Sequence, residues 1–104
     1  MTSDFALATC DEILRELGGR LREQRLAQSL KQSELAAMAG VSVGTVKKLE
    51  HSGVSSLESV VRVVQALGLS GELQGLFLLQ RQSIAQMALA EKAKRQRAPR
   101  SKRA

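Results

Sequence analysis

Apolar residues recur at helical spacing along most of this chain, in segments separated by Gly, Ser and polar residues. The first segment follows Thr9 and Glu12, which have the spacing of a capping box at a helix start. Its apolar positions are Ile13, Leu14, Leu17, Leu21 and Leu26. Because glycine weakens a helix, Gly18 and Gly19 leave open whether this helix is bent or broken, and the pattern places the first helix of the folded module at residues 20–28.

The next two segments are short and meet at Gly40. A second helix is predicted to begin at Lys31 or Gln32 and to stop at Gly40, and Ser42 can cap a third helix. Ala36 is small where the third helix crosses the second, and Gly40 permits the positive φ of a tight turn. The inward positions of the pair are Leu35, Ala36, Ala39, Val41, Val46 and Leu49. The pattern therefore predicts two helices locked at a steep angle.

Two more helices are predicted downstream. A fourth helix follows Ser55 or Ser56 and closes at Gly68, and a fifth begins at Ser70. The apolar stripe expected on the fourth is Leu57, Val60, Val61, Val64 and Leu67. The positions expected to point inward on the fifth are Leu73, Leu76, Phe77 and Leu79. Residues 83–86 repeat the capping pattern and can open a terminal helix.

Composition supports an all-α fold. Hydrophobic residues make up 43% of the 104 residues, but only two are aromatic, so the core must consist of aliphatic side chains, which suit close-packed helices. The length is that of one domain. We divide the chain into an N-terminal helical arm (1–17), a central helical domain (18–79), and a short helix with a basic tail (80–104).

Several functional classes lack support in this sequence. Cys10 is the only cysteine and His51 the only histidine, so neither an internal disulfide nor a metal site is expected, and no cofactor is indicated. No catalytic set is recognisable, so the protein is not expected to be an enzyme. The apolar stretches are too short to span a bilayer, and a reducing cytoplasmic location is expected.

The positive charge is concentrated at the C-terminus. The formal net charge is +6, and seven of the 16 basic residues fall within residues 92–104, where there is no acidic residue. They are Lys92, Lys94, Arg95, Arg97, Arg100, Lys102 and Arg103. This segment is either a solvated, solubilising end or an arm that binds DNA or another partner. The apolar residues just before it, Ile84, Met87, Ala88 and Leu89, favour a contact surface.

Five motifs resemble the Xre-like, lambda-repressor-like helix-turn-helix family over residues 17–79. They are Arg22-Glu23-Gln24-Arg25, Gln32-Ser33-Glu34-Leu35-Ala36, Ala39-Gly40-Val41-Ser42, Val46-Lys47-Lys48-Leu49-Glu50 and Leu67-Gly68. The resemblance implies a five-helix lambda-repressor-like bundle, here with an N-terminal helical extension and a basic C-terminal tail. It also implies dimeric binding to a two-fold operator, with the third helix in the major groove.

The same resemblance assigns roles to residues outside the third helix. Gln32, at the start of the second helix, is implied to touch a phosphate. Arg25 is implied to pair with Glu50 and so to tie the first helix to the third, a structural role shared with Ala36 and Gly40.

The third helix carries most of the expected DNA contacts. Lys48 can donate to guanine O6 or N7, and Lys47 to a phosphate or flanking base, while Val43 can pack on a thymine methyl group. The full candidate set is Gln32, Ser33, Ser42, Val43, Gly44, Thr45, Lys47, Lys48 and His51. The family often has longer polar side chains where Val43 and Gly44 stand, so DNA shape and phosphate contacts are expected to share the recognition.

The functional hypothesis is a transcriptional repressor that binds double-stranded DNA as a homodimer at a palindromic operator. The compact size, the extra segment after the fifth helix and the sequence of residues 67–73 also look like those of the antitoxins paired with Hip-type kinase toxins. This suggests an autoregulatory antitoxin with a toxin kinase as partner. A stand-alone phage-type repressor or a restriction-modification controller is the alternative. From another class, a protein-interaction or RNA-binding module would use the third helix only as structure, although the aromatic stacking residues of RNA readers are missing.

Overall fold

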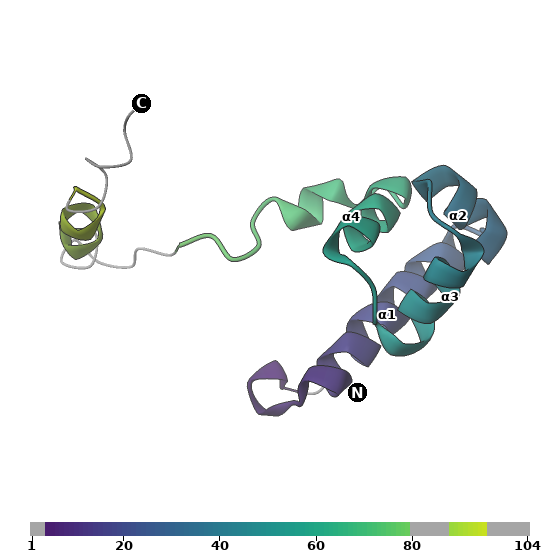
Figure 1. Ribbon diagram of the computed structural model, residues 1–104, viewed down its shortest axis with the longest axis horizontal. Helices are drawn as coiled ribbons and strands as arrows, with labels where there is room; N and C mark the ends of the chain where they lie inside the picture. The colour runs from purple at the N-terminus through teal and green to yellow at the C-terminus, as the bar shows by residue number, and fades with distance from the viewer. Residues whose placement is uncertain (1–3, 80–87, 96–104) are drawn as a thin grey trace. The chain divides into compact units, whose positions relative to one another are not determined.

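The computed structural model describes residues 4–79 and 88–95, and within these ranges every regular element is helical, as predicted (Figure 1). The elements are η1 (Phe5–Leu7), α1 (Cys10–Ala27), α2 (Gln32–Ala39), α3 (Val43–Ser52), α4 (Leu57–Ala66) and η2 (Ser70–Leu73), where η marks a 3₁₀ helix. Residues 88–95 are also helical, whereas the start expected for that helix at 83–86 lies outside the described residues. The chain forms two compact units, residues 1–74 and 75–104.

The first helix is a single, unbroken element. The predicted capping box is present, because Glu12 N donates to Thr9 Oγ1 over 3.2 Å and Thr9 N donates to Glu12 Oε1 over 3.0 Å. From there α1 continues through Gly18 and Gly19 to Ala27. The break that the two glycines left open does not occur, and residues 10–17 form the first half of α1.

Gly18 has a packing role in place of a helix-breaking one. A Cβ atom at Gly18 would collide with the carbonyl oxygen of Leu49 in α3, and one at Gly53 would collide with the backbone of Leu14 in α1. Gly53 also has φ 77°, as the left-handed cap that ends α3. The two glycines therefore let the backbones of α1 and α3 approach more closely than any side chain would allow.

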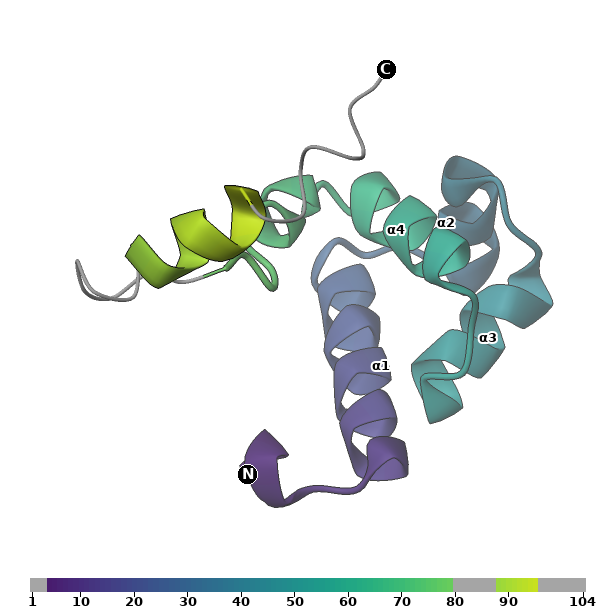
Figure 2. The same ribbon diagram turned by 60° about the vertical axis from the view of Figure 1, so that its left-hand side comes forward.

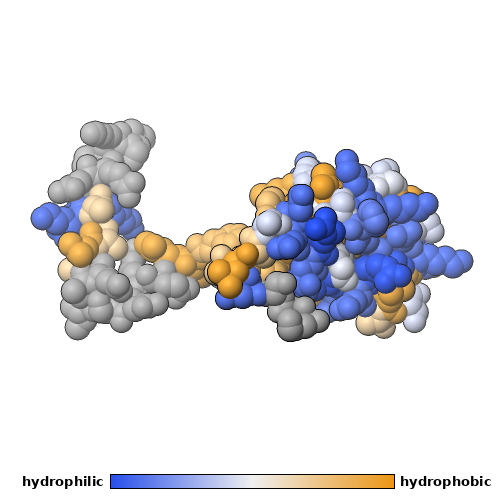
Figure 3. All heavy atoms as spheres, turned by 90° about the horizontal axis from the view of Figure 1, so that it is seen from below, coloured by the Kyte–Doolittle hydropathy of each residue, from blue (hydrophilic) through white to orange (hydrophobic). Residues whose placement is uncertain are grey.

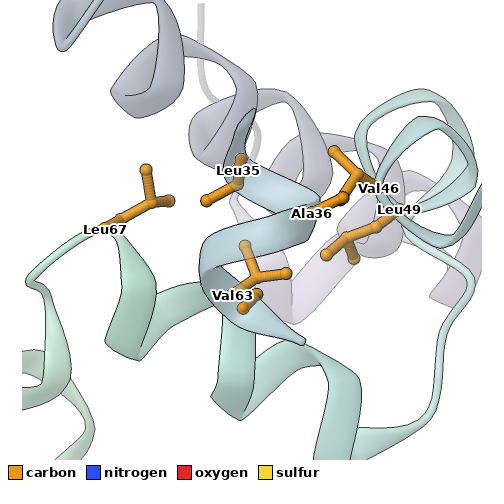
Figure 4. Close-up of a cluster of buried hydrophobic side chains, with 7 residues drawn as sticks. Leu35, Ala36, Val46, Leu49, Val63 and Leu67 are labelled. Carbon is orange, nitrogen blue, oxygen red and sulfur yellow. The ribbon is translucent and has the colours of Figure 1, made fainter. Parts of the chain in front are cut away.

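The core of the first unit lies around α2, which packs against both α3 and α4 (Figure 2). Figure 4 shows aliphatic side chains from these three helices meeting in one cluster. The buried members are Leu35, Ala36, Ala39, Val46, Leu49, Val63 and Leu67, with Val41 packed against them. The core positions predicted on the second and third helices are thus confirmed.

The turn between α2 and α3 has the geometry that the sequence predicts. Gly40 has φ 72°, in the left-handed region, and Val41 N donates to the carbonyl oxygen of Ala36 over 3.1 Å. Ser42 then caps α3, since its Oγ accepts a hydrogen bond from Thr45 N over 3.0 Å. The end of α2 and the start of α3 are therefore joined by three residues, Gly40, Val41 and Ser42, whose backbone or side-chain groups are held by the two helices.

Two of the predicted apolar stripes are wrong in part. Leu57, the first residue of α4, is 78% exposed. The inward face is formed by Val60, Val63 and Val64 within the helix and by its C-cap, Leu67. The fifth helix begins at Ser70 as predicted but is only a 3₁₀ helix ending at Leu73. The later residues expected to point inward, Leu76, Phe77 and Leu79, are all exposed.

The early end of that fifth helix has a local cause. Residues 74–77 form a turn, and Phe77 has φ 58°, a left-handed conformation that cannot continue a helix and is uncommon for a residue with a Cβ. Gly71 and Gly75 also lower the helix propensity of the segment. The apolar pattern alone does not reveal either effect.

The two adjacent glycines of α1 provide a matched stability test. We expect Gly18→Ala to lower the free energy of unfolding by roughly 1–3 kcal/mol or more, because the new methyl group meets α3 backbone. We expect Gly19→Ala to raise it by up to about 1 kcal/mol, because no atom lies within 4 Å of that position and alanine is the better helix former. Urea unfolding followed by circular dichroism measures both, and equal effects of the two substitutions would contradict the close packing of α1 on α3.

Candidate nucleic-acid interface

One face of α3 is buried and the other is open to solvent. Val46, Leu49 and Glu50 are buried against the other helices. The exposed residues of the helix are Val43, Gly44, Lys47, Lys48 and His51. Five of the nine DNA-facing candidates thus lie together on the outward side of one helix. Figure 3 shows one side of the molecule, on which the surface of the first unit is mostly hydrophilic.

Ser42 and Thr45 are less free than the sequence suggests. Their hydroxyl oxygens lie 2.8 Å apart in a mutual hydrogen bond, and Thr45 is only partly exposed. Ser42 also accepts from Thr45 N as the helix cap. The pair therefore fixes the N-terminal end of α3, and each hydroxyl keeps only part of its hydrogen-bonding capacity for an outside group.

The start of α2 lies beside this face. Gln32 is the first residue of α2 and is partly buried, and its Nε2 donates to Glu50 Oε1 over 3.0 Å. One N–H of the Gln32 amide is therefore used inside the protein, and the second is left for another acceptor. Ser33, next in the helix, is exposed.

A buried ion pair connects α1 to α3. Arg25 Nε donates to Glu50 Oε2 over 2.6 Å, and Arg25 Nη2 donates to Glu50 Oε1 over 2.9 Å, so the guanidinium and carboxylate meet as a two-pronged fork. Both side chains are almost fully buried. Arg25 Nη1 also donates to the carbonyl oxygen of Leu30 over 2.7 Å. This fork is the contact that the family resemblance implies, and it holds α1, the loop before α2, and α3 in one arrangement.

Neighbouring groups keep the Glu50 carboxyl ionised. Burial alone would raise its pKa, but the hydrogen bonds from Arg25 and Gln32, together with the charges of Arg25 and Arg22, outweigh burial and hold the pKa below its usual value of 4.5. The hydrogen bond to Glu50 likewise raises the pKa of the Arg25 guanidinium against the effect of burial. Both partners are therefore charged at neutral pH.

Two hollows flank the exposed residues of α3. One, of about 280 Å³, is lined by Arg22, Gln32, Lys47, Glu50 and His51. The other, of about 380 Å³, is lined by Thr45, Lys48, Val54, Ser55, Ser56 and Ser59. Sequence reasoning missed Arg22 and the residues before α4. For Arg22 a signal exists, since it precedes Arg25 by three residues and so shares part of one helix face with it.

The fold and this face together define a class of protein. A helix-turn-helix frame holds a solvent-facing helix with two exposed lysines, the arrangement by which regulatory proteins bind duplex DNA. A family model described as "Helix-turn-helix" matches residues 21–74, more than half of the chain. The chain therefore belongs to the helix-turn-helix family of Xre and lambda-repressor type, and it is a DNA-binding transcription regulator. Comparison with curated proteins finds no match.

Across residues 4–79 and 88–95, no helix combines the length and apolar character needed to cross a membrane. Over the same ranges, His, Cys, Asp and Glu side chains form no group of three or more suited to a metal ion.

Removing one partner of the buried fork should destabilise the protein strongly. We expect Arg25→Met to lower the free energy of unfolding by about 3–5 kcal/mol, because it leaves a buried carboxylate without its partner. We expect the double variant Arg25→Met/Glu50→Leu to recover most of that loss, since an apolar pair carries no uncompensated charge. Urea unfolding at neutral pH measures both changes, and equal losses in the two variants would contradict this account.

The fork also predicts the direction of a pH effect. Because the pKa of Glu50 is lower in the folded protein than in the unfolded chain, its stabilisation is present above about pH 4.5 and is lost as the pH falls through the folded value. We therefore expect the wild-type protein to lose more stability than Arg25→Met/Glu50→Leu on acidification from neutral pH. Parallel pH profiles of the two proteins would rule out this contribution from Glu50.

Proposed function

We propose that the protein is a repressor that binds an operator in double-stranded DNA through the outward face of α3. The observation that carries this proposal is the exposure of Lys47 and Lys48 on a helix whose other face is fixed by the core and by the Arg25–Glu50 fork. A groove tolerates little misplacement of a recognition helix, so a rigid support is what this function requires.

The exposed residues have distinct proposed roles. Lys48 donates to guanine O6 or N7, and Lys47 donates to a phosphate or a flanking base. Val43 packs on a thymine methyl group at the N-terminal end of α3, where a Cβ on Gly44 would meet only the Ser42 hydroxyl, 3.8 Å away. Gln32 and His51 contact phosphates at the edge of the interface, and Thr45 contacts a base or the DNA backbone. Ser33 and Ser42 complete the proposed DNA-binding surface. Short side chains at 43 and 44 bring the backbone of α3 close to the bases, which favours recognition of groove shape.

We propose further that two copies bind together, with their α3 helices in successive major grooves about 34 Å apart on a palindromic site. The second unit supports this, because Leu76, Phe77 and Leu79 expose apolar side chains that a second copy would cover. Such a dimer would cover a promoter in the cytoplasm and repress transcription from it.

The lysines of α3 provide the direct test. After an operator has been selected from random duplexes with the wild-type protein, we expect Lys48→Ala to weaken operator binding about 10- to 100-fold and to reduce the preference over scrambled DNA. We expect Lys47→Ala to weaken binding to both duplexes alike. Fluorescence anisotropy measures the affinities, and Arg20→Ala is the control, since Arg20 pairs with Glu16 on α1.

Unchanged duplex affinity in Lys47→Ala/Lys48→Ala would contradict the repressor proposal. It would favour the alternative in which α3 is only structural, within a protein-interaction or RNA-binding module.

The basic C-terminal segment is proposed to bind DNA without regard to sequence. Deleting residues 92–104 removes seven basic residues, so we expect weaker binding to nonspecific duplexes and a smaller dependence of affinity on salt, with the operator preference unchanged. Titrations at several salt concentrations measure the slope, and the same slope in both proteins would indicate a tail that only solubilises the chain.

A more specific proposal is that the protein is the antitoxin of a Hip-type toxin–antitoxin pair and represses its own operon. The exposed apolar segment after η2 favours this, because it offers a surface to a toxin kinase as well as to a second copy. Co-expression with the product of the neighbouring gene tests it, with a stable complex and an inhibited kinase as the expected result. A neighbouring gene that encodes no kinase would favour a stand-alone repressor or a restriction-modification controller.

A further inference from the structure

We propose that one hollow beside α3, here called the Arg22 pocket, binds one DNA backbone phosphate. The pocket is lined by Arg22, Gln32, Lys47, Glu50 and His51. Within this pocket, Arg22 is the residue that contributes most to the affinity for the phosphate. This inference rests on the proposed function and adds a residue of α1 to the DNA-binding surface.

Three helices contribute to the Arg22 pocket. Arg22 comes from α1, Gln32 is the first residue of α2, and Lys47 and His51 come from the outward side of α3. Its volume of about 280 Å³ admits a phosphate group together with water. Because α3 supplies three of its residues, and two of these, Lys47 and His51, are exposed, the Arg22 pocket is continuous with the face proposed to enter the groove.

The pocket contains cations that the protein itself leaves unpaired. Within the described residues, neither Arg22 nor Lys47 forms an ion pair or a side-chain hydrogen bond. Two positive side chains and an imidazole therefore converge on one hollow without an anion of their own. Their mutual repulsion is relieved when an anion binds between them.

The one acid in the pocket does not cancel this charge. Both Glu50 oxygens accept hydrogen bonds inside the protein, Oε2 from Arg25 and Oε1 from Arg25 and Gln32. The charge of Arg25 compensates that of Glu50, so Arg22 and Lys47 leave the pocket positive. The charge of Arg22 also contributes to the lowered pKa of Glu50, which agrees with its guanidinium lying close to this site.

The donor set matches a phosphate better than a single carboxylate. A guanidinium presents parallel N–H groups that fit two phosphate oxygens, and Lys47 supplies a point charge. The Gln32 amide is held through one N–H by Glu50, which leaves its second N–H to donate to one of the same two non-bridging oxygens. The buried fork thus orients a phosphate ligand in addition to positioning α3.

The test is the effect of Arg22→Ala on the full-length protein with two duplexes, the selected operator and a scrambled sequence. Because a phosphate contact carries no sequence information, we expect binding to both duplexes to weaken by the same factor, about tenfold for each subunit of the bound dimer. We expect the slope of log affinity against log salt to become smaller by about 0.9 for each subunit of the bound dimer. The affinity of Arg22→Lys should fall between those of the wild-type protein and Arg22→Ala, since lysine keeps the positive charge but lacks the paired N–H groups of a guanidinium.

Arg20→Ala is the matched control. It removes the same charge from the same helix two residues away, but Arg20 pairs with Glu16 over 2.9 Å and does not line the Arg22 pocket. We expect its affinity and salt slope to equal those of the wild-type protein. Thermal unfolding at neutral pH should change little in Arg22→Ala, because Arg22 is exposed, makes no ion pair, and is the smallest of the influences that lower the pKa of Glu50.

Ethylation interference locates the phosphate itself. Ethylating the phosphate that is bound in the Arg22 pocket removes its charge. We therefore expect one position in each half-site at which ethylation weakens the wild-type complex but has little further effect on the complex of Arg22→Ala. An Arg22→Ala protein with wild-type affinity, salt slope and interference pattern would overturn the proposed phosphate-binding site but would not contradict the repressor proposal. A changed ratio of operator to scrambled binding would also overturn it, since Arg22 would then read bases. Failure of the wild-type protein to select any duplex would overturn both proposals.

Discussion

The structure depends on a pair of buried charges in which each side-chain nitrogen and oxygen has a hydrogen-bond partner. Burying an arginine and a glutamate is costly, and only good mutual geometry with further hydrogen bonds offsets the cost. Here Glu50 accepts hydrogen bonds from Arg25 and Gln32, and Arg25 Nη1 donates to the carbonyl oxygen of Leu30. Four parts of the chain therefore meet at one point, and a shift of any helix would break a bond to a buried charge.

Close backbone packing adds a second restraint on the same helix. At the far end of α3, Gly18 and Gly53 let α1 and α3 touch without side chains between them. The Gly40 turn and the Ser42 cap fix the near end, and the aliphatic cluster around α2 fills the space between (Figure 4). The helix proposed to contact DNA is thus held at both ends, so its exposed side chains have a defined position before any partner arrives.

Much of this arrangement could be predicted from the sequence, because the relevant signals are local. Gly40, the Ser42 cap and the spacing of Leu35, Val46 and Leu49 each specify structure within a few residues. The role of Gly18 could not be predicted, since it arises from its contact with the backbone of Leu49, in a helix far away in the sequence. The same holds for Arg22, whose significance depends on Lys47 and His51 being brought beside it. The sequence pattern predicts too long a fifth helix, because apolar spacing does not indicate a residue with left-handed backbone such as Phe77.

The central claim is that the outward face of α3 enters duplex DNA. Titrating ¹⁵N-labelled protein with the selected operator and recording backbone amide shifts tests it most directly, because every helix is observed at once. The account predicts the largest shifts at Val43–Ser52 and at the first turn of α2, with α4 nearly unchanged. Large shifts confined to the N-terminal half of α1 or to residues 75–79, with α3 unaffected, would contradict it.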